Sequence, residues 1–387
     1  MSRADVVVAF HDAGVGGPLR SHERELSWLS ETHRTEVLVP AGWRAQEFGE
    51  LGATVTPGPY AALGVPGSVS ELVRSIARAQ REQRWFRRML RERQPRLAIA
   101  VTSALPTFML AARRVKVPSM ALVAELWVGA GRGRLREGAG RALLDMELRL
   151  ADSIVACSEA VARQFGDSPK VRTIHPGIDP GYSQGTGMAF RLANEIPADA
   201  PLIACIGNLT RGRGQKVLLR ALPALLTGRP DLVCVIKGNP FPRTADHEFE
   251  SELRDLAGEL GVEGSVVWVS ASGSVADLYA AAQVVVNPAT THPESFGRVA
   301  FEAGFAGTPA VCTDFGATPE LHTDGVTALL VPRWDAAALA AAVDRILGDP
   351  VLGSRLAEGA ARLARRIADP VESLAAFQEA VSAQIGS

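Results

Sequence analysis

The most informative stretch of this sequence is Glu294-Ser-Phe-Gly-Arg-Val-Ala-Phe-Glu302, which lies shortly after the apolar run Val284-Val-Val-Asn-Pro288. The run predicts a buried strand, and the stretch predicts a helix that begins near Ser295. The two carboxylates then lie roughly 12 Å apart along the axis, at ~1.5 Å rise per residue. Free N–H groups at a helix start attract phosphate, and Gly297 lets phosphate approach the backbone. This spacing suits a nucleotide sugar, whose ribose and sugar lie on either side of a diphosphate.

The alternative is an ordinary surface helix, because two glutamates eight residues apart are common there. The surroundings of Glu302 argue against this alternative. Its neighbours between Ala300 and Ala306 are nearly all apolar or small, whereas an exposed helix face carries more charge. A carboxylate among apolar neighbours needs a polar partner, and the hydroxyls of a ribose would serve.

The composition predicts a soluble, two-domain globular protein. The chain has 387 residues, of which 47% are hydrophobic and 21% charged, and this length exceeds one ordinary core. A net charge of −1 gives no global field that would attract nucleic acid. The four cysteines fit neither a zinc site nor a disulfide framework. We expect a cytoplasmic protein without a secretory signal or an integral membrane segment.

Both halves of the chain alternate apolar strand-like runs with helical stretches, which is typical of α/β domains with parallel sheets. We predict two Rossmann-like domains, residues 1–182 and 183–367, with a last helix at about 368–387 that packs back on the first. Ligands of such sheets bind at the carboxyl ends of the strands, so we expect the two domains to face each other across a cleft. The strands are expected near residues 6–10, 36–39, 97–102, 120–124, 153–157, 171–175, 202–207, 233–237, 266–269, 284–287, 310–313 and 329–331.

Two loops are further candidates for donor contacts. Gly16 and Gly17 follow the first strand, although a plain turn is as good an interpretation. The segment Asn208–Gln215 occupies the equivalent place in the second half, and its Arg211 and Arg213 can direct guanidinium groups at phosphate. Solvated loop arginines are the alternative, and the position at a strand's carboxyl end favours the functional interpretation.

The histidines offer one catalytic candidate, and the sequence shows no metal-binding motif. His11 closes the first strand and is the best catalytic candidate among the histidines, while His175 and His292 are expected to be structural or exposed. The sequence contains no HExxH motif, no DxD triplet and no cluster of cysteine and histidine. We therefore expect neither a metal nor another cofactor.

These features resemble the retaining GT-B glycosyltransferases of family 4. The segment from Glu294 to Glu302 matches that family's E-x7-E motif. The similarity extends over about residues 5–345, is strong in the second half, and is looser over residues 40–120. The other matching segments are Asn208–Gln215, Gly307–Glu320, Asp324–Pro332, Ala151–Glu159 and His175–Asp179.

The resemblance implies roles for these positions. Glu302 would bind the ribose hydroxyls, and Glu294 would contact hydroxyls of the donor sugar. Arg213 stands where the family has a phosphate-binding lysine. The remaining donor-site positions are the amides of Ser295, Phe296 and Gly297, the glycines Gly16 and Gly17, and Asn208, Arg211 and Lys216.

Two positions depart from the family pattern. The family often has arginine where this chain has Asn208, and Arg211 or Lys216 would have to compensate. The family's His-Glu pair appears here as Ala124-Glu125, so His11 or Glu125 would have to replace the histidine near the transferred sugar.

We expect a metal-independent, hexosyltransferase-type enzyme that moves a sugar from a nucleoside diphosphate sugar to an acceptor hydroxyl with retained configuration. Its catalytic candidates are Glu294, Arg213 and His11. The acceptor is a small molecule, a glycan or a lipid-linked substrate, and no nucleic-acid partner is expected. The alternatives are a nucleotide-sugar epimerase or phosphorylase of the same fold, or an inactive relative that binds nucleotide.

Overall fold

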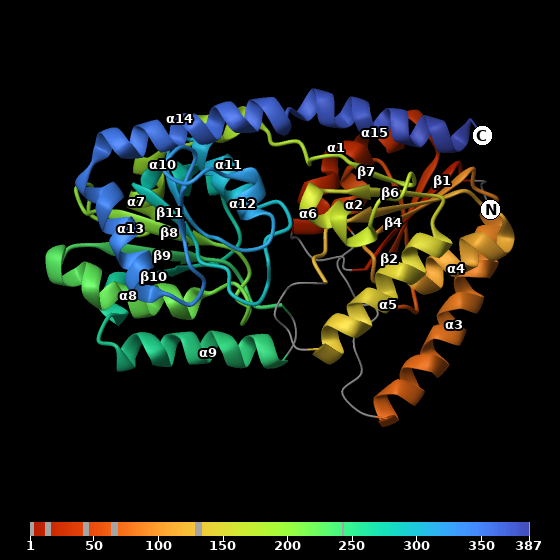
Figure 1. The fold of residues 1–387 in the computed structure, drawn as a ribbon, viewed down its shortest axis with the longest axis horizontal. Coiled ribbons are helices and arrows are strands. Elements are labelled where there is room, and N and C mark those ends of the chain that lie inside the picture. Colours follow the sequence, from red (N-terminus) through yellow and green to blue (C-terminus); the bar gives the residue numbers. More distant parts are fainter. Residues whose placement is uncertain are drawn as a thin grey trace. The chain divides into compact units, whose positions relative to one another are not determined.

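The computed structural model describes residues 4–11, 17–41, 46–62, 69–127, 134–241 and 244–386. The chain forms two compact units, residues 1–177 with 370–387, and residues 178–369. The first boundary lies five residues before the predicted one. Each unit is a parallel sheet with helices packed on it (Figure 1).

In its described part, the first unit holds a seven-stranded sheet in the order β3-β2-β1-β4-β5-β6-β7. The strands are β1 (Val6–Phe10), β2 (Thr35–Pro40), β3 (Thr54–Gly58), β4 (Leu97–Val101), β5 (Ser119–Val123), β6 (Ser153–Ala156) and β7 (Val171–Thr173). The helices are α1 (Gly17–Thr32), α2 (Gln46–Glu50), α3 (Val69–Arg93), α4 (Pro106–Val115), α5 (Arg134–Leu150), α6 (Glu159–Ala162), the 3-10 turn η1 (Arg163–Phe165) and α15 (Pro370–Ile385).

The described part of the second unit holds a six-stranded sheet in the order β10-β9-β8-β11-β12-β13. The strands are β8 (Leu202–Ile206), β9 (Val233–Lys237), β10 (Val266–Val269), β11 (Val284–Asn287), β12 (Ala310–Thr313) and β13 (Leu329–Val331). The helices are α7 (Gly187–Ala193), α8 (Gln215–Gly228), α9 (Thr244–Glu259), α10 (Val275–Ala281), α11 (Arg298–Phe305), α12 (Thr318–Leu321), α13 (Ala336–Gly348) and α14 (Pro350–Ile367), with the 3-10 turns η2 (Pro180–Gln184) and η3 (Glu263–Ser265).

Both faces of the second sheet are buried, which explains why its strands are continuous apolar runs. Alternate residues of β8 show this arrangement. Ile203 packs in a core with α8, α9 and α13, whereas Leu202 packs in a core with α7, α10 and α11. Twelve strands were predicted, and the structure confirms each of them within about two residues at either end.

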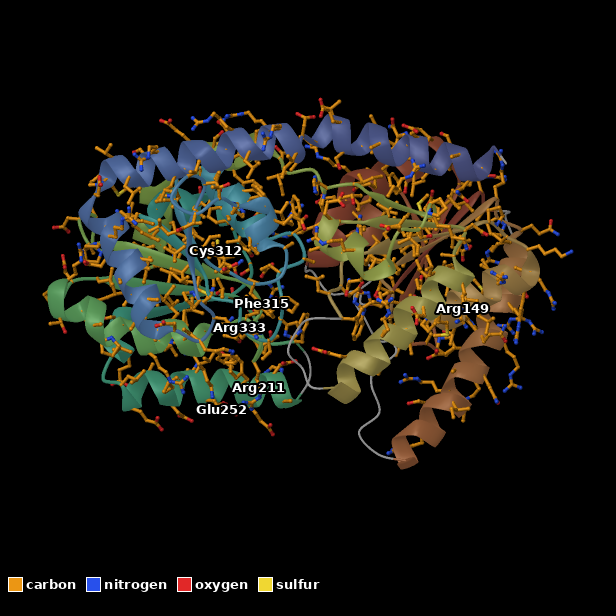
Figure 2. All side chains as sticks on the ribbon, in the orientation of Figure 1. Arg149, Arg211, Glu252, Cys312, Phe315 and Arg333 are labelled. Atoms are coloured by element: carbon orange, nitrogen blue, oxygen red, sulfur yellow. The ribbon has the colours of Figure 1, made fainter. Side chains whose placement is uncertain are left out.

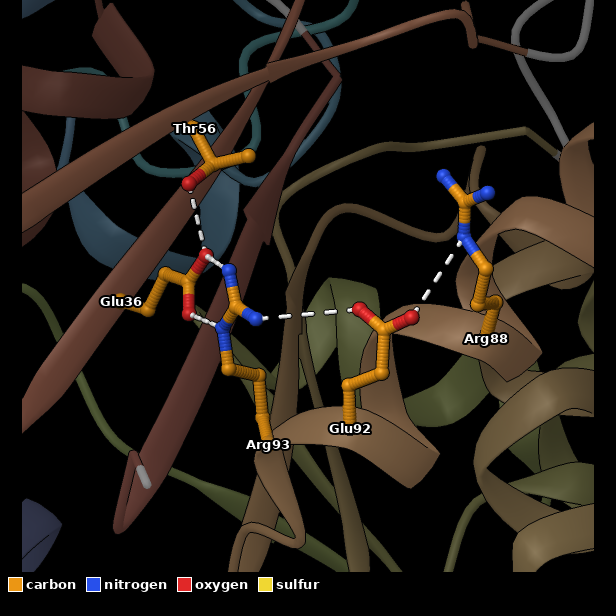
Figure 3. A network of polar contacts seen from close by, with 5 residues as sticks. All are labelled: Glu36, Thr56, Arg88, Glu92 and Arg93. Atoms are coloured by element: carbon orange, nitrogen blue, oxygen red, sulfur yellow. Dashed lines mark hydrogen bonds and ion pairs between the residues drawn. The ribbon is translucent and has the colours of Figure 1, made fainter. Parts of the chain in front are cut away.

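Strand β3 was not predicted. Its sequence contains Pro57, which cannot donate to a sheet ladder, and its side chains are mostly exposed. Both properties are typical of an edge strand. A polar contact fixes this edge: Glu36 of β2 accepts hydrogen bonds from Thr56 Oγ1 at 2.6 Å and from Arg93 Nη2 at 3.1 Å (Figure 3). Since Glu36 is buried, these partners satisfy a charge that would otherwise be costly.

The last helix, α15, belongs to the first unit. Phe377 lies in the core of that unit, 6.1 Å from the ring of Trp28. Ser373 Oγ donates to the His175 carbonyl at 2.7 Å. None of the helices in the described part of the chain is both long and apolar enough to span a bilayer.

Strand order reverses once in each sheet, between β1 and β4 in the first unit and between β8 and β11 in the second. At such a point the loops after two neighbouring strands diverge and leave room for a ligand at the carboxyl edge. In the second unit, these loops contain the predicted donor residues except Lys216 and Glu302, which lie in the helices that follow, α8 and α11.

Candidate functional site

The site lies on two loops of the second unit, one between β8 and α8 and one between β11 and α11. Because β8 and β11 are adjacent and parallel, both loops leave the same edge of the sheet. Backbone contacts join them: the Gly212 carbonyl accepts from the Thr290 amide at 2.9 Å and from the His292 amide at 3.3 Å. The two loops therefore form one platform.

Gly214 makes this close approach possible. Its φ of +79° lies in the left-handed region, and a Cβ at this position would lie 1.7 Å from the carbonyl oxygen of Pro288. Only glycine fits both the conformation and the space. Gly214 is also the N-cap of α8, so the same residue ends the loop and starts the helix.

Arg213 and Glu294 come together on this platform, although 81 residues separate them in the sequence. Arg213 Nη1 donates to Glu294 Oε1. The Glu294 side chain is only 12% exposed, whereas that of Arg213 is 41% exposed. A guanidinium carries five N–H donors, so Arg213 can hold Glu294 and still present donors toward an anion at the solvent side.

The backbone of Glu294 is fixed by the loop after β12. Its carbonyl accepts from the Ala317 amide at 2.7 Å, and a Cβ on Gly316 would lie 2.3 Å from that same oxygen. Phe315 in this loop lies under the Arg333 guanidinium, 4.5 Å from the ring centroid (Figure 2). In β12, burial and then the charge of Glu294 raise the pKa of the Cys312 thiol to about 12, which keeps that thiol protonated.

The predicted start of the following helix was wrong. Helix α11 begins at Arg298, and Gly297 is its N-cap with a φ of +74°, a conformation that interrupts the helix. Ser295 and Phe296 therefore belong to the loop, and the axial estimate of roughly 12 Å between the carboxylates no longer applies. The Phe296 ring is buried and lies 5.1 Å from that of Phe301, so its side chain is structural.

Glu302 lies in the second turn of α11 and is 7% exposed. Its Oε2 accepts from the Tyr279 hydroxyl at 2.8 Å, and its Oε1 accepts from Arg298 Nε at 3.1 Å. Tyr182 is adjacent, since its ring lies 5.7 Å from that of Tyr279. Burial and then the charge of Glu302 raise the pKa of Tyr182 to about 12, against an opposing effect of Arg298.

Sequence reasoning did not find Tyr279, Arg298 or Tyr182. Arg298 could have been found, because it precedes Glu302 by four residues and such pairs face each other on a helix. Tyr279 comes from α10 and Tyr182 from η2, and no sequence spacing connects either residue to Glu302.

Arg211 or Lys216 was predicted to compensate for Asn208 at the diphosphate. Both side chains contact Glu252 of α9. Arg211 Nη1 donates to it at 2.8 Å (Figure 2), and Lys216 Nζ donates to it at 2.6 Å. Both cations also lie over the Phe249 ring, at 5.3 and 5.5 Å from its centroid. Contact with a diphosphate remains a prediction for these two residues, and it would compete with Glu252. The Asn208 carbonyl accepts from Gln215 Nε2 at 3.1 Å.

The remaining candidates belong to the first unit. Gly16 lies outside the described residues, and Gly17 begins α1. His11 Nδ1 donates to the Val101 carbonyl at 3.1 Å, because a carbonyl oxygen can only accept. His11 follows β1 and Val101 ends β4, the two strands at the point where the order reverses.

Glu125, the other proposed substitute for the family histidine, is occupied by the turn after β4. Its carboxylate accepts from Thr102 Oγ1, from the Ser103 amide at 3.3 Å and from Ser103 Oγ at 3.2 Å. Thr102 has a φ of 143°, a conformation that is costly for a branched residue. Glu125 therefore stabilises a strained turn.

No group of three histidine, cysteine, aspartate or glutamate side chains comes together as a metal ligand set within the described ranges. For an anion, the site offers the guanidinium of Arg213 and the partial positive charge at the N-termini of α8 and α11. A guanidinium and a helix N-terminus can each bind an anion directly.

Two family models match this chain. The model for "Glycosyl transferases group 1" matches residues 189–363, and the model for "Glycosyltransferase Family 4" matches residues 23–182. Together they cover most of both units.

Curated relatives include a D-inositol 3-phosphate glycosyltransferase from Saccharomonospora viridis, 35% identical over 217 residues, which are 54% of this chain and 49% of that protein. The protein of the same name from Actinosynnema mirum is 36% identical over 230 residues, 56% of this chain and 54% of that protein. This chain spans about half the length of these curated relatives.

Solved structures with a similar fold include Anabaena Alr3699/HepE in complex with UDP and glucose, with a TM-score of 0.79, 20% identity, and coverage of 98% of this chain and 100% of that one. A sucrose-phosphate synthase from Thermosynechococcus elongatus has a TM-score of 0.78 and 19% identity, with 99% of each chain covered. At these identities the comparison shows that the fold is shared.

Proposed function

We propose, from the premise that this chain belongs to the family 4 glycosyltransferases of the GT-B fold, that it moves a sugar from a nucleoside diphosphate sugar to an acceptor hydroxyl with retained configuration. The observation that carries this proposal is the Arg213–Glu294 pair on the platform at the carboxyl edge of the second sheet. It combines a cation for the leaving diphosphate with a carboxylate for the hydroxyls of the transferred sugar.

The diphosphate gains negative charge as the sugar leaves, and stabilising that charge is the main electrostatic task. Arg213 and the N–H groups at the start of α8 supply positive potential that is in place before the reaction. We propose that these groups remove the need for a metal ion, which transfer assays with a chelator would test. We also propose that the transferred sugar is a hexose. Transfer assays with donors that carry sugars of other sizes would test this.

Donor binding would begin at the nucleoside. In this proposal Glu302 binds the ribose, the diphosphate lies over the amides of Ser295, Phe296 and Gly297, and Glu294 contacts the sugar. The known complex of Anabaena Alr3699/HepE with UDP and glucose supports a uridine nucleotide as the first donor to try. Since Glu294 is bound to Arg213, the arginine can orient both the carboxylate and the phosphate.

The acceptor would be held by the first unit, where His11 follows β1 at the carboxyl edge of the sheet. Attack on the same face as the departing diphosphate, with a phosphate oxygen helping to remove the acceptor proton, is the retaining course that we propose. The acceptor panel should include D-inositol 3-phosphate, after which the curated relatives are named, together with glycans and lipid-linked substrates. A cytoplasmic location agrees with four buried cysteines, all among the described residues, that form no disulfide.

Thermal stability with a panel of nucleotides and nucleotide sugars tests the proposal first. A ligand at 100 times its Kd raises the free energy of unfolding by ~2.7 kcal/mol. Transfer assays with Arg213→Ala and Glu302→Ala follow, with product analysis to identify the anomeric configuration. Full turnover by both variants would contradict the assignment of Arg213 and Glu302 to the donor site. Conversion of the nucleotide sugar into its epimer without an acceptor would indicate an epimerase instead.

A further inference from the structure

Trp334 has a backbone conformation that does not suit a bulky side chain. It lies in the β13 turn, which consists of Arg333 and Trp334 between β13 and α13, and its φ is +69°. This left-handed region suits glycine or asparagine and is costly for a large residue. Among the described residues, the other non-glycine residues with a positive φ are all polar: Gln94, Thr102, Lys116 and Glu195. Trp334 is therefore the one apolar residue of the described chain that is held in this conformation.

Packing does not explain the tryptophan either. Trp334 is 55% exposed, and it is the only aromatic residue among the large exposed apolar residues in the described part of the chain. A tryptophan stabilises a fold through the area that it buries, and more than half of this one stays in contact with solvent. Glycine or asparagine would fit the turn with less strain. A residue that strains the backbone without serving the core points to a role in binding.

The other residue of the β13 turn is an exposed cation. The Arg333 guanidinium lies over the Phe315 ring, 4.5 Å from its centroid (Figure 2). Within the described ranges, Arg333 forms no ion pair with a carboxylate. A ring does not neutralise the charge of a guanidinium, so Arg333 can still pair with an anionic group.

The β13 turn lies beside the loop that holds Glu294. The Asp314 amide donates to the Val331 carbonyl at 2.8 Å, which joins the loop after β12 to the end of β13. In the same loop, the Ala317 amide donates to the Glu294 carbonyl at 2.7 Å. Since β11, β12 and β13 are adjacent and parallel, the loops after them share the carboxyl edge of the sheet, where ligands bind. None of the predicted donor residues lies in the β13 turn.

We propose that the β13 turn binds a saccharide that carries an anionic group, a phosphate or a carboxylate. The indole of Trp334 would contact the C–H face of the sugar ring, and Arg333 would pair with the anion. An aromatic side chain suits this task because it offers a large contact area and loses little conformational freedom on binding. The inference goes beyond the proposed function, since it assigns a saccharide contact outside the donor residues.

Ligand-observed NMR by saturation-transfer difference tests the inference on the full chain, with glucose, glucose 6-phosphate and glucuronic acid as probes. A hydrogen bond to a charged group strengthens binding about 10-fold or more. The wild type should therefore bind at least one of the two charged saccharides about 10-fold more tightly than glucose, and the tighter one identifies the anion. Equal affinity for all three, or binding of none, would overturn the inference and leave the proposed function unaffected.

Trp334→Asn should change affinity and stability differently. Affinity for the charged saccharide should fall about 5-fold or more, because the contact with the indole is lost. The midpoint of urea unfolding should stay the same or rise, because asparagine tolerates the left-handed region. Unchanged affinity would overturn the inference. A clear loss of stability would also overturn it, because the indole would then serve the fold.

Arg333→Gln should lower the affinity for the charged saccharide to that for glucose and leave glucose binding unchanged. Arg365→Gln is the matched control. Arg365 is an exposed arginine of α14 in the same unit, and its guanidinium lies 5.4 Å from the centroid of the Phe305 ring. The control variant should bind all three saccharides like the wild type. An equal loss in both variants would show a general effect of charge and would overturn the role of Arg333.

Glu294→Gln separates the β13 turn from the donor site. This variant removes the charge of the carboxylate that is proposed to contact the donor sugar, and it leaves Arg333 and Trp334 in place. It should bind the charged saccharide as tightly as the wild type. Loss of binding in Glu294→Gln, with binding retained in Trp334→Asn, would place the saccharide in the donor site and overturn the inference.

Discussion

The Arg213 guanidinium donates to the Glu294 carboxylate across the two loops that follow β8 and β11. The pair is partly open to solvent, with 41% of the Arg213 side chain exposed. Solvent screening limits such a pair to about 0–1 kcal/mol of stability. The pair lies at the carboxyl edge of the sheet, where α/β proteins bind ligands. We therefore expect it to contribute to donor binding rather than to stability.

Arg213→Ala should therefore separate activity from stability. We expect kcat/KM for a nucleotide sugar to fall about 100-fold or more, because a charge that stabilises the leaving group is typically worth that much. The midpoint of urea unfolding should change little. Steady-state kinetics and denaturant titration on the same preparation measure both quantities.

Arg254→Ala is the matched control for this prediction. Arg254 pairs with Glu250 on α9 at 2.9 Å, and its side chain is 51% exposed. The variant removes an arginine of similar exposure that lies on a surface helix. Its activity should equal that of the wild type, and a similar loss in both variants would show that the Arg213 effect is not specific.

Gly214→Ala should disturb the platform from the backbone. The new Cβ would meet the Pro288 carbonyl at 1.7 Å, and the residue would keep a left-handed φ. We expect a loss of roughly 2 kcal/mol or more in the free energy of unfolding, together with weaker nucleotide binding as the two loops separate. Chemical denaturation and calorimetry would measure these changes.

Gly228→Ala serves as the comparison, because Gly228 lies at the other end of the same helix and a Cβ there would meet nothing within 4 Å. Alanine has the higher helix propensity, so this variant should be as stable as the wild type or slightly more stable. If Gly214→Ala behaved in the same way, the close approach of the two loops would have no energetic consequence.

The second sheet could be predicted from sequence because its strands are buried on both faces and stand out as apolar runs, such as Val233–Lys237 and Val284–Asn287. Strand β3 lacked that signal, since it lies at an edge and contains Pro57. The start of α11 was placed too early because a glycine in the left-handed region, Gly297, ended the loop three residues later. Backbone conformation of this kind is not encoded in the hydrophobic pattern.

The candidate site could be predicted only in part. The motif gave Glu294 and Glu302, and the loop position gave Arg213. The contact of Arg211 and Lys216 with Glu252 depends on how α9 packs beside α8, and the hydrogen bond from Tyr279 depends on how α10 packs beside α11. Such tertiary neighbours leave no spacing in the sequence.

His322 should make the protein less stable in mild acid. Burial lowers the pKa of this imidazole to about 4, and its ring stacks on Phe301 at 4.6 Å. Between the unfolded value of about 6.5 and pH 4 the unfolded state binds the proton and the folded state does not, so stability falls as the pH falls. His322→Gln should remove about 3 kcal/mol of this pH dependence. Urea titrations from pH 7 to pH 4 would measure it, and an unchanged acid slope would contradict the prediction.

Glu147 should have the opposite effect and make the protein less stable as the pH rises above about 4.5. This residue of α5 is fully buried, and among the described residues neither of its carboxylate oxygens has a hydrogen-bond partner. Burial, and then the charge of Glu125, raise the pKa of Glu147 well above its usual value. The folded state therefore holds a proton that the unfolded state releases above about pH 4.5, and stability falls as the pH rises until the folded group also ionises.

Glu147→Gln keeps the shape of the side chain and removes the titration. We expect the variant to lose the decline in stability between pH 5 and pH 8 and to be at least as stable as the wild type at pH 8. Glu147→Ala separates charge from packing, because it should lose the same pH dependence while a cavity lowers its stability by about 2 kcal/mol at every pH. The midpoints of denaturant unfolding, measured across the pH range for the wild type and both variants, would test these expectations. A decline of wild-type size that persisted in both variants would show that other groups cause it and would contradict the prediction.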